Sequence, residues 1–342
     1  MIDKINPLVT IGLTTYNRPD FLIEAVHSVL NQKYKNFKLI IGNDFPESKV
    51  TFAVLGIDED PRIEIINFKE NIGEINNLNY LLSQANSEWF TWLADDDVLS
   101  HYFLDSLIKT IKHSDQNVCA VYSEFANGEA PDKFFFDTPH LANSIQFDSS
   151  NFIADYVQRK RIRIIGSCGL LNTNILKAIG GFPNLNFSSG IYGDGLLPIL
   201  LAQYGKINLV THPLVFLRTH EGSLSASLLN YDEYISAEPR FLIELSRICL
   251  LIEGEEFKDE CVYHMLHWFA KDAFFVLFRL SPKSKAFSFL QKSILLGKFL
   301  DYQFKVNYPR LKIRFWIPHT FNIIKIIVTS SISMASKYFK KL

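Results

Sequence analysis

The sequence is poor in cysteine and carries almost no net charge. Its four cysteines are Cys119, Cys168, Cys249 and Cys261. No two of them form a C-x-x-C pair, so neither a zinc knuckle nor a disulfide framework is expected, and we predict a reducing, cytoplasmic compartment. The net charge of −1 provides no overall field for nucleic acid, so no nucleic-acid partner is expected. The apolar run near the N-terminus is too short for a signal peptide.

Several motifs of known catalytic classes are also missing. There is no G-x-G-x-x-G after the first apolar run, no G-x-x-x-x-G-K-[ST] and no G-x-S-x-G. A sugar nucleotidyltransferase would need a glycine-rich first loop, and "TTYNRPD" (14–20) contains no glycine. What is present is a chain of 342 residues with 48% hydrophobic content, enough to bury a substantial core and to form more than one structural unit.

The first hundred residues alternate strand and helix signals. Short apolar runs predict strands at 8–13, 37–42, 62–68 and 89–94. Apolar residues at helical spacing predict helices after Pro19 and within 71–85. This alternation favours a mostly parallel α/β sheet, in which ligands bind beyond the carboxyl ends of the strands. The polar clusters after the first, second and fourth strands should therefore converge on one crevice.

The rest of the chain is less regular. We predict strands at 117–125 and 161–171, a helix at 172–182 closed by two glycines, a helix from 193 and a strand pair at 209–220. From about residue 230 the pattern is helical. The expected organisation is a first half-domain at 1–115, a second at 116–228 and a helical region at 229–342.

Three consecutive carboxylates, Asp95, Asp96 and Asp97, follow the fourth predicted strand. One interpretation is a solvated loop in which Asp95 or Asp97 caps the helix that begins near His101. The other is a site for Mg²⁺ or Mn²⁺, because these hard cations prefer oxygen ligands and are commonly held by carboxylates together with substrate phosphates.

The ordered set strand–"TTYNR"–helix, strand–"ND", "NIG" and strand–"ADDD" resembles the family 2 glycosyltransferases over roughly residues 7 to 225. The resemblance implies a GT-A fold, a Rossmann-like nucleotide-diphospho-sugar transferase domain, here followed by a C-terminal helical extension. It also implies an inverting, metal-dependent transfer of a sugar from a nucleotide-diphosphate donor to a glycan or lipid-linked acceptor, in surface polysaccharide biosynthesis. A catalytically silent sugar- or partner-binding module with the same fold is the alternative function.

The resemblance also assigns roles to residues. Asp95 would contact the ribose, Tyr16 would stack on the nucleobase, and Asp44 would accept a hydrogen bond from a pyrimidine N3–H. The alternatives are a helix-capping turn at 14–17 and an ordinary polar turn at Asp44. A UDP-sugar is favoured, although Asn76 to Asn79 replace the basic residue that many uridine-binding members carry. The implied donor-binding residues are Thr14, Thr15, Tyr16, Asn17, Arg18, Asp44, Asn71, Gly73, Asp95 and Asp96.

The metal, Mn²⁺ or Mg²⁺, would be held by Asp96, Asp97 and His220, with a packed structural histidine as the alternative for His220. Arg218 could pair with the donor phosphates. By the same resemblance, Asp194 in "GDG" would be the general base that deprotonates the acceptor hydroxyl. Its alternative is an N-cap of the following helix.

Two basic segments complete the sequence analysis. Arg159, Lys160, Arg161 and Arg163 form either a solvated edge or a contact for an acceptor phosphate. After Asp301 the chain has eight basic residues and no acidic one, which leaves −9 on the rest. The longest uncharged run in this tail, 326–336, has eleven residues, too few to span a bilayer. We expect the tail to hold the protein peripherally on the anionic inner face of the cell membrane. A pair of helices packed on the globule is the alternative.

Overall fold

The computed structural model describes residues 6–114, 117–132, 135–136, 143–157, 162, 164–185, 193–220 and 240. The chain divides into two compact units, and all of these residues belong to the first, which contains Met1–Leu228 and Ser236–Glu244. The predicted helical region at 229–342, its basic tail and the cluster Arg159, Lys160, Arg161 and Arg163 lie outside the described residues, and the half-domain boundaries stay predictions.

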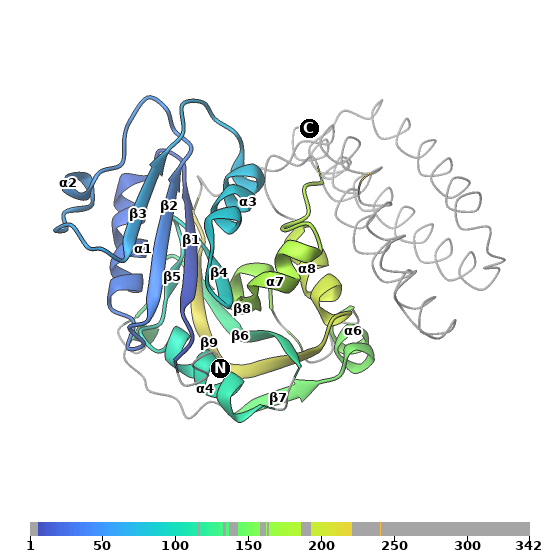
Figure 1. Ribbon diagram of the computed structural model, residues 1–342. Helices are drawn as coiled ribbons and strands as arrows, with labels where there is room; N and C mark the ends of the chain where they lie inside the picture. Colours follow the sequence, from blue (N-terminus) through green and yellow to red (C-terminus); the bar gives the residue numbers. More distant parts are fainter. Residues whose placement is uncertain are drawn as a thin grey trace, which may run out of the picture. The chain divides into compact units, whose positions relative to one another are not determined.

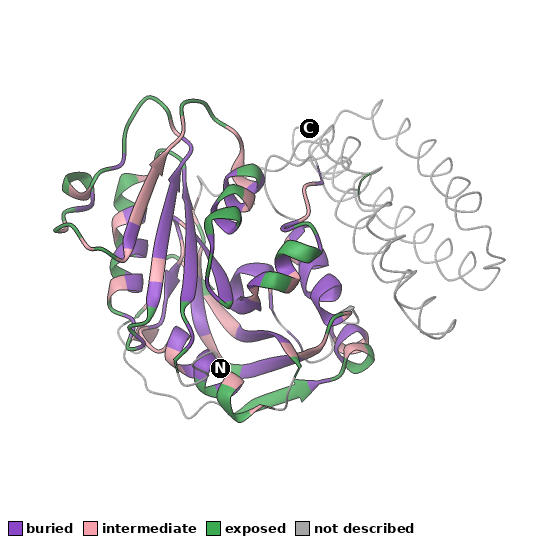
Figure 2. Cartoon of the chain, viewed as in Figure 1, coloured by how far each residue is buried: buried purple, intermediate pink, exposed green. Residues whose placement is uncertain are grey.

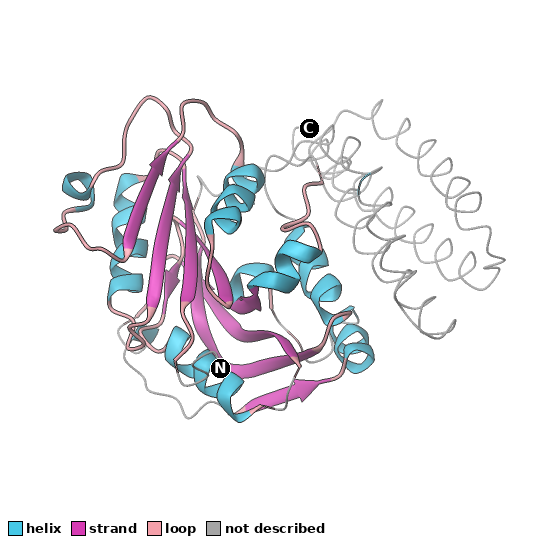
Figure 3. Ribbon diagram, in the orientation of Figure 1, coloured by secondary structure: helices cyan, strands magenta, loops and turns pink. Residues whose placement is uncertain are grey.

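The first part of the unit is a parallel sheet with helices on both faces (Figures 1 and 3). The strands are β1 (Val9–Thr15), β2 (Phe37–Asn43), β3 (Ile63–Asn67) and β4 (Trp89–Ala94), in the spatial order β3-β2-β1-β4. The helices are α1 (Pro19–Leu30), α2 (Phe52–Leu55), α3 (Glu74–Gln84) and α4 (Phe103–His113). The four predicted strands and the helices predicted after Pro19 and within 71–85 are confirmed; α2 was not predicted.

The second part extends the same sheet with mixed directions. Its elements are β5 (Val98–Leu99), β6 (Val118–Gly128), β7 (Ser144–Phe147), α6 (Ser149–Val157), the 3₁₀ turn η1 (Gly166–Cys168), β8 (Gly169–Asn172), α7 (Thr173–Ala178), α8 (Gly193–Ala202) and β9 (Lys206–Arg218). Strand β8 lies antiparallel between β4 and β6, whereas β6 and β9 are parallel. The sheet of the whole unit is therefore mixed rather than mostly parallel.

Two strand predictions in this part were wrong in extent. The strand predicted at 161–171 begins only at Gly169, because the chain forms a 3₁₀ turn at 166–168. The strand pair predicted at 209–220 is one long strand, β9. Pro213 lies where the β6–β9 register shifts, and a bulge tolerates a residue without a backbone N–H.

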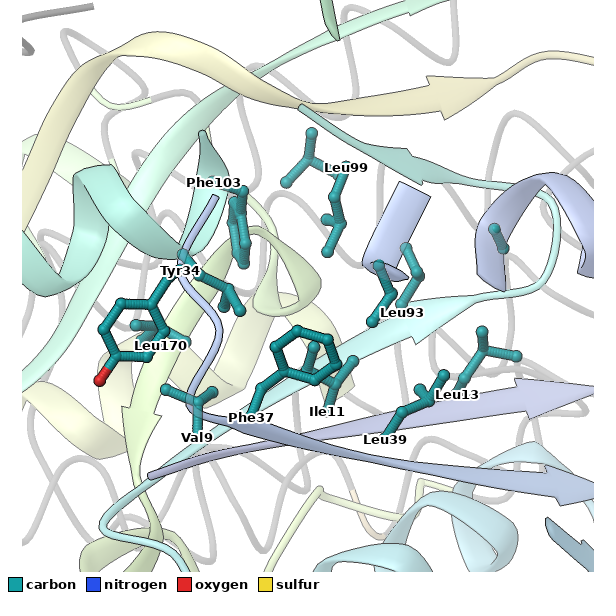
Figure 4. Packing of buried hydrophobic residues seen from close by; sticks show 14 of the residues in the cluster. Val9, Ile11, Leu13, Tyr34, Phe37, Leu39, Leu93, Leu99, Phe103 and Leu170 are labelled. Carbon is teal, nitrogen blue, oxygen red and sulfur yellow. The ribbon is translucent and has the colours of Figure 1, made fainter. Parts of the chain in front are cut away.

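Strand β1 is buried throughout its length (Figure 2). Val9, Ile11 and Leu13 point to the face covered by α1 and α4 and are fully buried there (Figure 4). Gly12 points to the opposite face, where a Cβ would lie 2.8 Å from the ring of Phe90. A strand buried on both faces reads as a continuous apolar run, and its first solvent-accessible groups come in the loop after its carboxyl end. Within the described residues, no helix combines the length and apolarity needed to cross a membrane.

Candidate active site

Asp95 lies at the centre of the loops that follow β1 and β4. Its carboxylate accepts hydrogen bonds from Thr15 Oγ1 (2.8 Å), from the Tyr16 backbone N–H (3.2 Å) and from Arg18 Nη1 (3.0 Å). The residue is only 4% exposed. Burial raises the pKa of Asp95, and the guanidinium of Arg18 opposes that rise. Asp95 therefore joins the two loops through a carboxyl group that accepts three hydrogen bonds.

One carboxylate oxygen of Asp96, Oδ2, contacts both Arg18 and His220. Arg18 Nη1 donates to Asp96 Oδ2 at 2.9 Å, so that one nitrogen bridges Asp95 and Asp96. His220 Nε2 lies 3.0 Å from the same oxygen, and its ring packs on Phe21 at a centroid distance of 4.8 Å. The bridging arginine offsets the electrostatic repulsion between the adjacent carboxylates of Asp95 and Asp96.

Asp97 is held by the end of β9. The backbone N–H of Arg218 donates to Asp97 Oδ1 at 3.0 Å, and Arg218 Nε donates to the Asp96 carbonyl at 3.0 Å. The Arg218 guanidinium also pairs with Glu24 and covers the ring of Phe21. Its side chain is 7% exposed, so Arg218 braces the aspartate turn rather than standing free for phosphates. Burial, followed by the charge of Asp96, raises the pKa of Asp97 well above its usual range.

The capping alternatives for these loops were wrong. The N-cap of α4 is Tyr102, which makes no side-chain capping bond, so neither Asp95 nor Asp97 caps that helix. The N-cap of α1 is Arg18, also without a capping bond, and Pro19 begins the helix as predicted. Asn17 has a φ of 53°, which turns the chain back over the site.

The loop after β1 leaves one aromatic ring in solvent. Tyr16 is 48% exposed and meets Phe45, from the loop after β2, edge to face at 5.2 Å. Beneath it, Thr14 Oγ1 accepts a hydrogen bond of 3.2 Å from the indole N–H of Trp92. The start of the loop is thus bonded to β4 through Thr14, and the Tyr16 ring remains exposed, as stacking on another ring requires.

Asp44 ties the loop after β2 to the start of α3. Its two oxygens accept hydrogen bonds of 2.8 Å from the backbone N–H groups of Ile72 and Gly73, and its own N–H donates to the Thr15 carbonyl at 3.0 Å. Asn71 accepts a further bond from Gly73, whose φ of 84° favours glycine. Burial raises the pKa of Asp44. Asp44 therefore connects the loop after β2 both to the end of β1 and to the start of α3.

Asp194 lies in the first turn of α8, not at its N-cap, because the helix begins at Gly193. Burial, then the negative charges of Glu74 and Asp97, raise the pKa of Asp194 well above its usual range. A Cβ at Gly166 would lie 3.0 Å from Asp194 Oδ1, so the 3₁₀ turn packs directly against this carboxylate. Asp194 thus shares one acidic site with Asp97 and the start of α3.

The predicted metal set is only partly assembled. Among the described residues there is no group of three or more histidine, cysteine or acidic side chains that could hold a metal. Asp96 and His220 form a pair, whereas Asp97 Oδ1 accepts from a backbone N–H. A carboxylate and an imidazole suit Mn²⁺, and a donor diphosphate would supply further oxygens. The residues present therefore fit a metal that binds together with its substrate.

Four residues near the site were not predicted. Glu24 and Glu74 look like solvent-facing positions on helices, and Trp92 reads as core. Gly166 fell within a supposed strand. None carries a local signal, because each acquires its place from contacts distant in sequence.

Residues 10–177 match the sequence model of glycosyl transferase family 2. An uncharacterized glycosyltransferase of Rickettsia typhi is 27% identical over 248 residues, 71% of this chain and 74% of that protein. TuaG of Bacillus subtilis, named as a teichuronic acid biosynthesis glycosyltransferase, is 28% identical over 42% of this chain and 57% of its own length. WcaA of Escherichia coli, named for colanic acid biosynthesis, is 36% identical over 28% of this chain and 34% of its own length.

Solved structures agree on the fold. S. aureus TarS 1–349 in complex with UDP-GlcNAc superposes with a TM-score of 0.58 at 17% identity, covering 80% of this chain and 73% of that one. The mannosyltransferase PcManGT of Pyrobaculum calidifontis, in complex with GDP-Man and Mn²⁺, gives a TM-score of 0.50 at 15% identity, covering 95% and 88%. The predicted GT-A fold is confirmed, and the chain belongs to the family 2 glycosyltransferases.

Proposed function

We propose that this chain is a metal-dependent, inverting glycosyltransferase that uses a nucleotide-diphospho-sugar, with a UDP-sugar favoured. The observation that carries the proposal is the acidic site in which the buried carboxylate of Asp194, in the first turn of α8, lies within the electrostatic influence of Asp97, in the loop after β4. A transfer needs a base on the acceptor side and charge compensation on the leaving-group side, and this arrangement supplies groups for both. TarS bound to UDP-GlcNAc supports the donor class.

The donor would bind across the loops after β1, β2 and β4. Tyr16 offers an exposed ring for the base, and Asp44 offers carboxylate oxygens for a pyrimidine N3–H. Each Asp44 oxygen already accepts one backbone hydrogen bond and retains a second lone pair. Asp95 would accept from the ribose hydroxyls. The remaining residues of the donor set, Thr14, Thr15, Asn17, Arg18, Asn71, Gly73 and Asp96, shape or line these loops.

The diphosphate would lie beside Asp96, Asp97 and His220. When bound, Mn²⁺ or Mg²⁺ would neutralise the charge that develops on the departing diphosphate. The protein's own part is to keep carboxylate and imidazole donors close together, as the 3.0 Å contact of Asp96 with His220 does. Arg18, already bonded to Asp95 and Asp96, would be a cationic contact for phosphate oxygens at this position.

Asp194 would act as general base. Its carboxylate takes the proton of the acceptor hydroxyl while that oxygen bonds to the anomeric carbon and the bond from that carbon to the diphosphate oxygen breaks. Attack from the face opposite the leaving group inverts the configuration. A raised pKa makes the ionised carboxylate a stronger base than an exposed aspartate, because burial disfavours its charge.

For the acceptor and the place of action, the relatives and the sequence give the support. TuaG and WcaA are named for surface polysaccharides, so we propose a glycan or lipid-linked acceptor in polysaccharide assembly. We further propose that the tail after Asp301 attaches the protein to the anionic inner face of the cell membrane, where such acceptors are presented. The cluster Arg159, Lys160, Arg161 and Arg163 would then be a candidate contact for an acceptor phosphate.

Calorimetry and product analysis test the function together. UDP and GDP are titrated into the full chain with and without Mn²⁺, and donor turnover is then followed with UDP-GlcNAc and GDP-mannose. We expect nucleotide binding that is strengthened at least about tenfold by Mn²⁺, and a product whose anomeric configuration, read by proton NMR, is opposite to that of the donor. Nucleotide binding without turnover of any sugar nucleotide would favour the silent binding module. Retention of configuration would exclude the single-base mechanism.

A further inference from the structure

The chain from Lys177 to Asn184, in and directly after α7, runs back along helix α3. Lys177, in α7, donates a hydrogen bond of 2.7 Å to the carbonyl of Ala85, directly after the C-terminus of α3. Seven residues later, Asn184 donates to the side chain of Asn76 at 3.3 Å, near the N-terminus of α3. Helices α3 and α7 lie side by side (Figure 1). Helix α3 therefore acts as a support for this segment over most of its length.

Asn79 makes the central contact of this support. Its Nδ2 donates to the Phe182 carbonyl at 3.0 Å, and its Oδ1 accepts from the Phe182 N–H at 2.8 Å. One side-chain amide thus satisfies both backbone groups of a single residue, as a neighbouring strand would. Gly181 precedes it with a φ of 81°, and a Cβ there would lie 2.3 Å from Asn79 Oδ1. The fit requires both the asparagine and the glycine.

Phe182 and Pro183 transmit this position to helix α8. The Phe182 ring packs edge-on against Trp92 at 5.8 Å, which fixes it to the end of β4. The Pro183 carbonyl lies so close to Gly193 that a Cβ there would be 2.6 Å from the oxygen. Gly193 directly precedes Asp194. The first turn of α8 therefore packs against the Phe182–Pro183 backbone, which is hydrogen-bonded to Asn79.

The other end of α3 belongs to the proposed donor site. Asp44 holds the Ile72 and Gly73 N–H groups directly before the helix, and the charge of Glu74, its first residue, acts on Asp194. Helix α3 is thus bonded to the proposed donor site at its N-terminus. Through Asn79 it is also bonded to the backbone against which the first turn of α8, with Asp194, packs.

We propose that Asn79 is a positioning residue for Asp194, which fixes the Phe182–Pro183 backbone against Gly193 and so sets where the Asp194 carboxylate stands relative to the donor loops. This inference rests on the proposed role of Asp194 as base. Because a displacement of about 1 Å at a reacting group can cost about 100-fold in rate, loss of Asn79 should lower turnover without weakening nucleotide binding.

The test compares Asn79→Ala with Asn76→Ala in the full chain. Asn76 lies one turn away on the same helix; its side chain accepts an exposed hydrogen bond of 3.3 Å from Asn184 and donates one of 2.7 Å to the Ile72 carbonyl, whereas Asn79 bonds the Phe182 backbone, so Asn76 is a matched control for that contact. Hydrogen exchange is measured for peptides covering 193–202 and 72–78. Binding of UDP is measured by calorimetry, and turnover as nucleotide release from whichever of UDP-GlcNAc and GDP-mannose the wild-type chain uses.

We expect Asn79→Ala to speed exchange at the start of α8, to lower kcat about 10- to 100-fold and to keep the UDP Kd within about twofold. Asn76→Ala should change none of these by more than about twofold. If Asn79→Ala does not fold, Asn79→Asp serves instead, because it keeps the acceptor for the Phe182 N–H and replaces the donor to the Phe182 carbonyl by a carboxylate oxygen that repels it.

The outcomes separate this inference from the proposed function. Unchanged exchange over 193–202, an equal effect of Asn76→Ala, or a loss of UDP affinity as large as the loss of kcat would each overturn the positioning role. If exchange responds as expected but Asp194→Asn retains wild-type turnover, the packing of α8 against the Phe182–Pro183 backbone is established and the base assignment is wrong.

Discussion

Arg18 offsets the repulsion between the adjacent carboxylates of Asp95 and Asp96. Two unit charges about 4 Å apart repel by about 1 kcal/mol in water and by more where water is excluded. One guanidinium nitrogen lies 3.0 Å from Asp95 and 2.9 Å from Asp96, while Asp97 turns to the backbone N–H of Arg218. The turn can therefore fold without a metal ion. At Asp194 the two described side chains whose charges act on its pKa, Glu74 and Asp97, are both acidic and raise it further beyond the effect of burial.

Asp194→Asn tests the base at its own carboxylate. We expect kcat to fall about 10²- to 10⁴-fold, because an amide cannot accept the acceptor proton, while the UDP Kd stays within about twofold. The same change removes a buried charge that Glu74 and Asp97 disfavour, so we expect the unfolding midpoint to rise by about 2–4 °C, which corresponds to about 1 kcal/mol. Steady-state kinetics, calorimetry and thermal unfolding provide the three measurements. Equal turnover in the variant and the wild type would exclude Asp194 as the base.

The raised pKa of Asp194 sets the direction of the pH dependence. The base works only when ionised, so kcat/KM should fall on acidification at a pH above that expected for an ordinary aspartate, about 4. The contribution of Asp194 to the free energy of unfolding changes in the opposite direction and increases on acidification. The folded state binds this proton more readily than the unfolded state, so ionisation destabilises the fold above the raised pKa, and that cost vanishes below about pH 4.

Paired pH series of wild type and Asp194→Asn measure both effects. The stability advantage of the variant should be largest at neutral pH and shrink as the pH falls through the raised pKa of Asp194. The acid limb of kcat/KM should be missing from the residual activity of the variant. A constant stability difference across the series would show that the charge of Asp194 is not what the substitution relieves.

At the scale of elements, the sequence was most informative where the sheet is parallel. Parallel strands place their carboxyl ends at one edge, so the convergence of "TTYNR", "ND" and "ADDD" followed from the order of strands and helices. The antiparallel insertion of β8 and the bulge at Pro213 have no such local pattern. For that reason neither the 3₁₀ turn beside Asp194 nor the brace formed by Arg218 was predicted.

The junction of β2 with α3 gives an element-level prediction. Asn77 donates to the Gly42 carbonyl at 2.8 Å, and a Cβ at Gly42 would lie 2.0 Å from Asn77 Oδ1. Gly42→Ala should therefore push α3 off the sheet and lower the free energy of unfolding by about 1–3 kcal/mol, measured by urea denaturation. Gly128→Ala, whose Cβ would meet only the tip of the Phe216 ring at 3.3 Å, is the control and should cost less.

The double variant identifies the cause. Asn77→Ala removes the atoms that the new methyl group would strike, so Gly42→Ala should cost less in that background than in the wild type, with a coupling of about 0.5–3 kcal/mol. Strictly additive costs would mean that Gly42 is needed for its backbone alone and that the close packing against Asn77 does not set the spacing of β2 and α3.

At the scale of the whole molecule, charge is divided between the ends of the chain. Residues up to Asp301 sum to −9 and the tail that follows to +8. An anionic membrane would repel the first part and attract only the second, so membrane attachment, if it is electrostatic, must come from the tail. Each basic residue near such a surface contributes up to about 1 kcal/mol. The aromatic residues Phe315, Trp316 and Phe321 would add interfacial burial.

The prediction is that replacing the eight basic residues of the tail by glutamine abolishes binding of the full chain to anionic vesicles, measured by co-sedimentation with phosphatidylserine-containing liposomes. The replaced residues are Lys305, Arg310, Lys312, Arg314, Lys325, Lys337, Lys340 and Lys341. Wild-type binding should weaken between 0.1 M and 1 M salt, because the Debye length falls from about 10 Å to about 3 Å. Turnover of a water-soluble donor and acceptor should be unchanged, since the proposed site ends at His220.

A control variant distinguishes the tail from basic charge in general. Replacing Arg159, Lys160, Arg161 and Arg163 by glutamine removes four positive charges from the other basic segment and should leave most vesicle binding intact. If this variant releases the protein as completely as the tail variant does, attachment follows total positive charge. If the tail variant still sediments with anionic vesicles, its lysines and arginines face water on a packed helical pair, and the acceptor must be reached by another route.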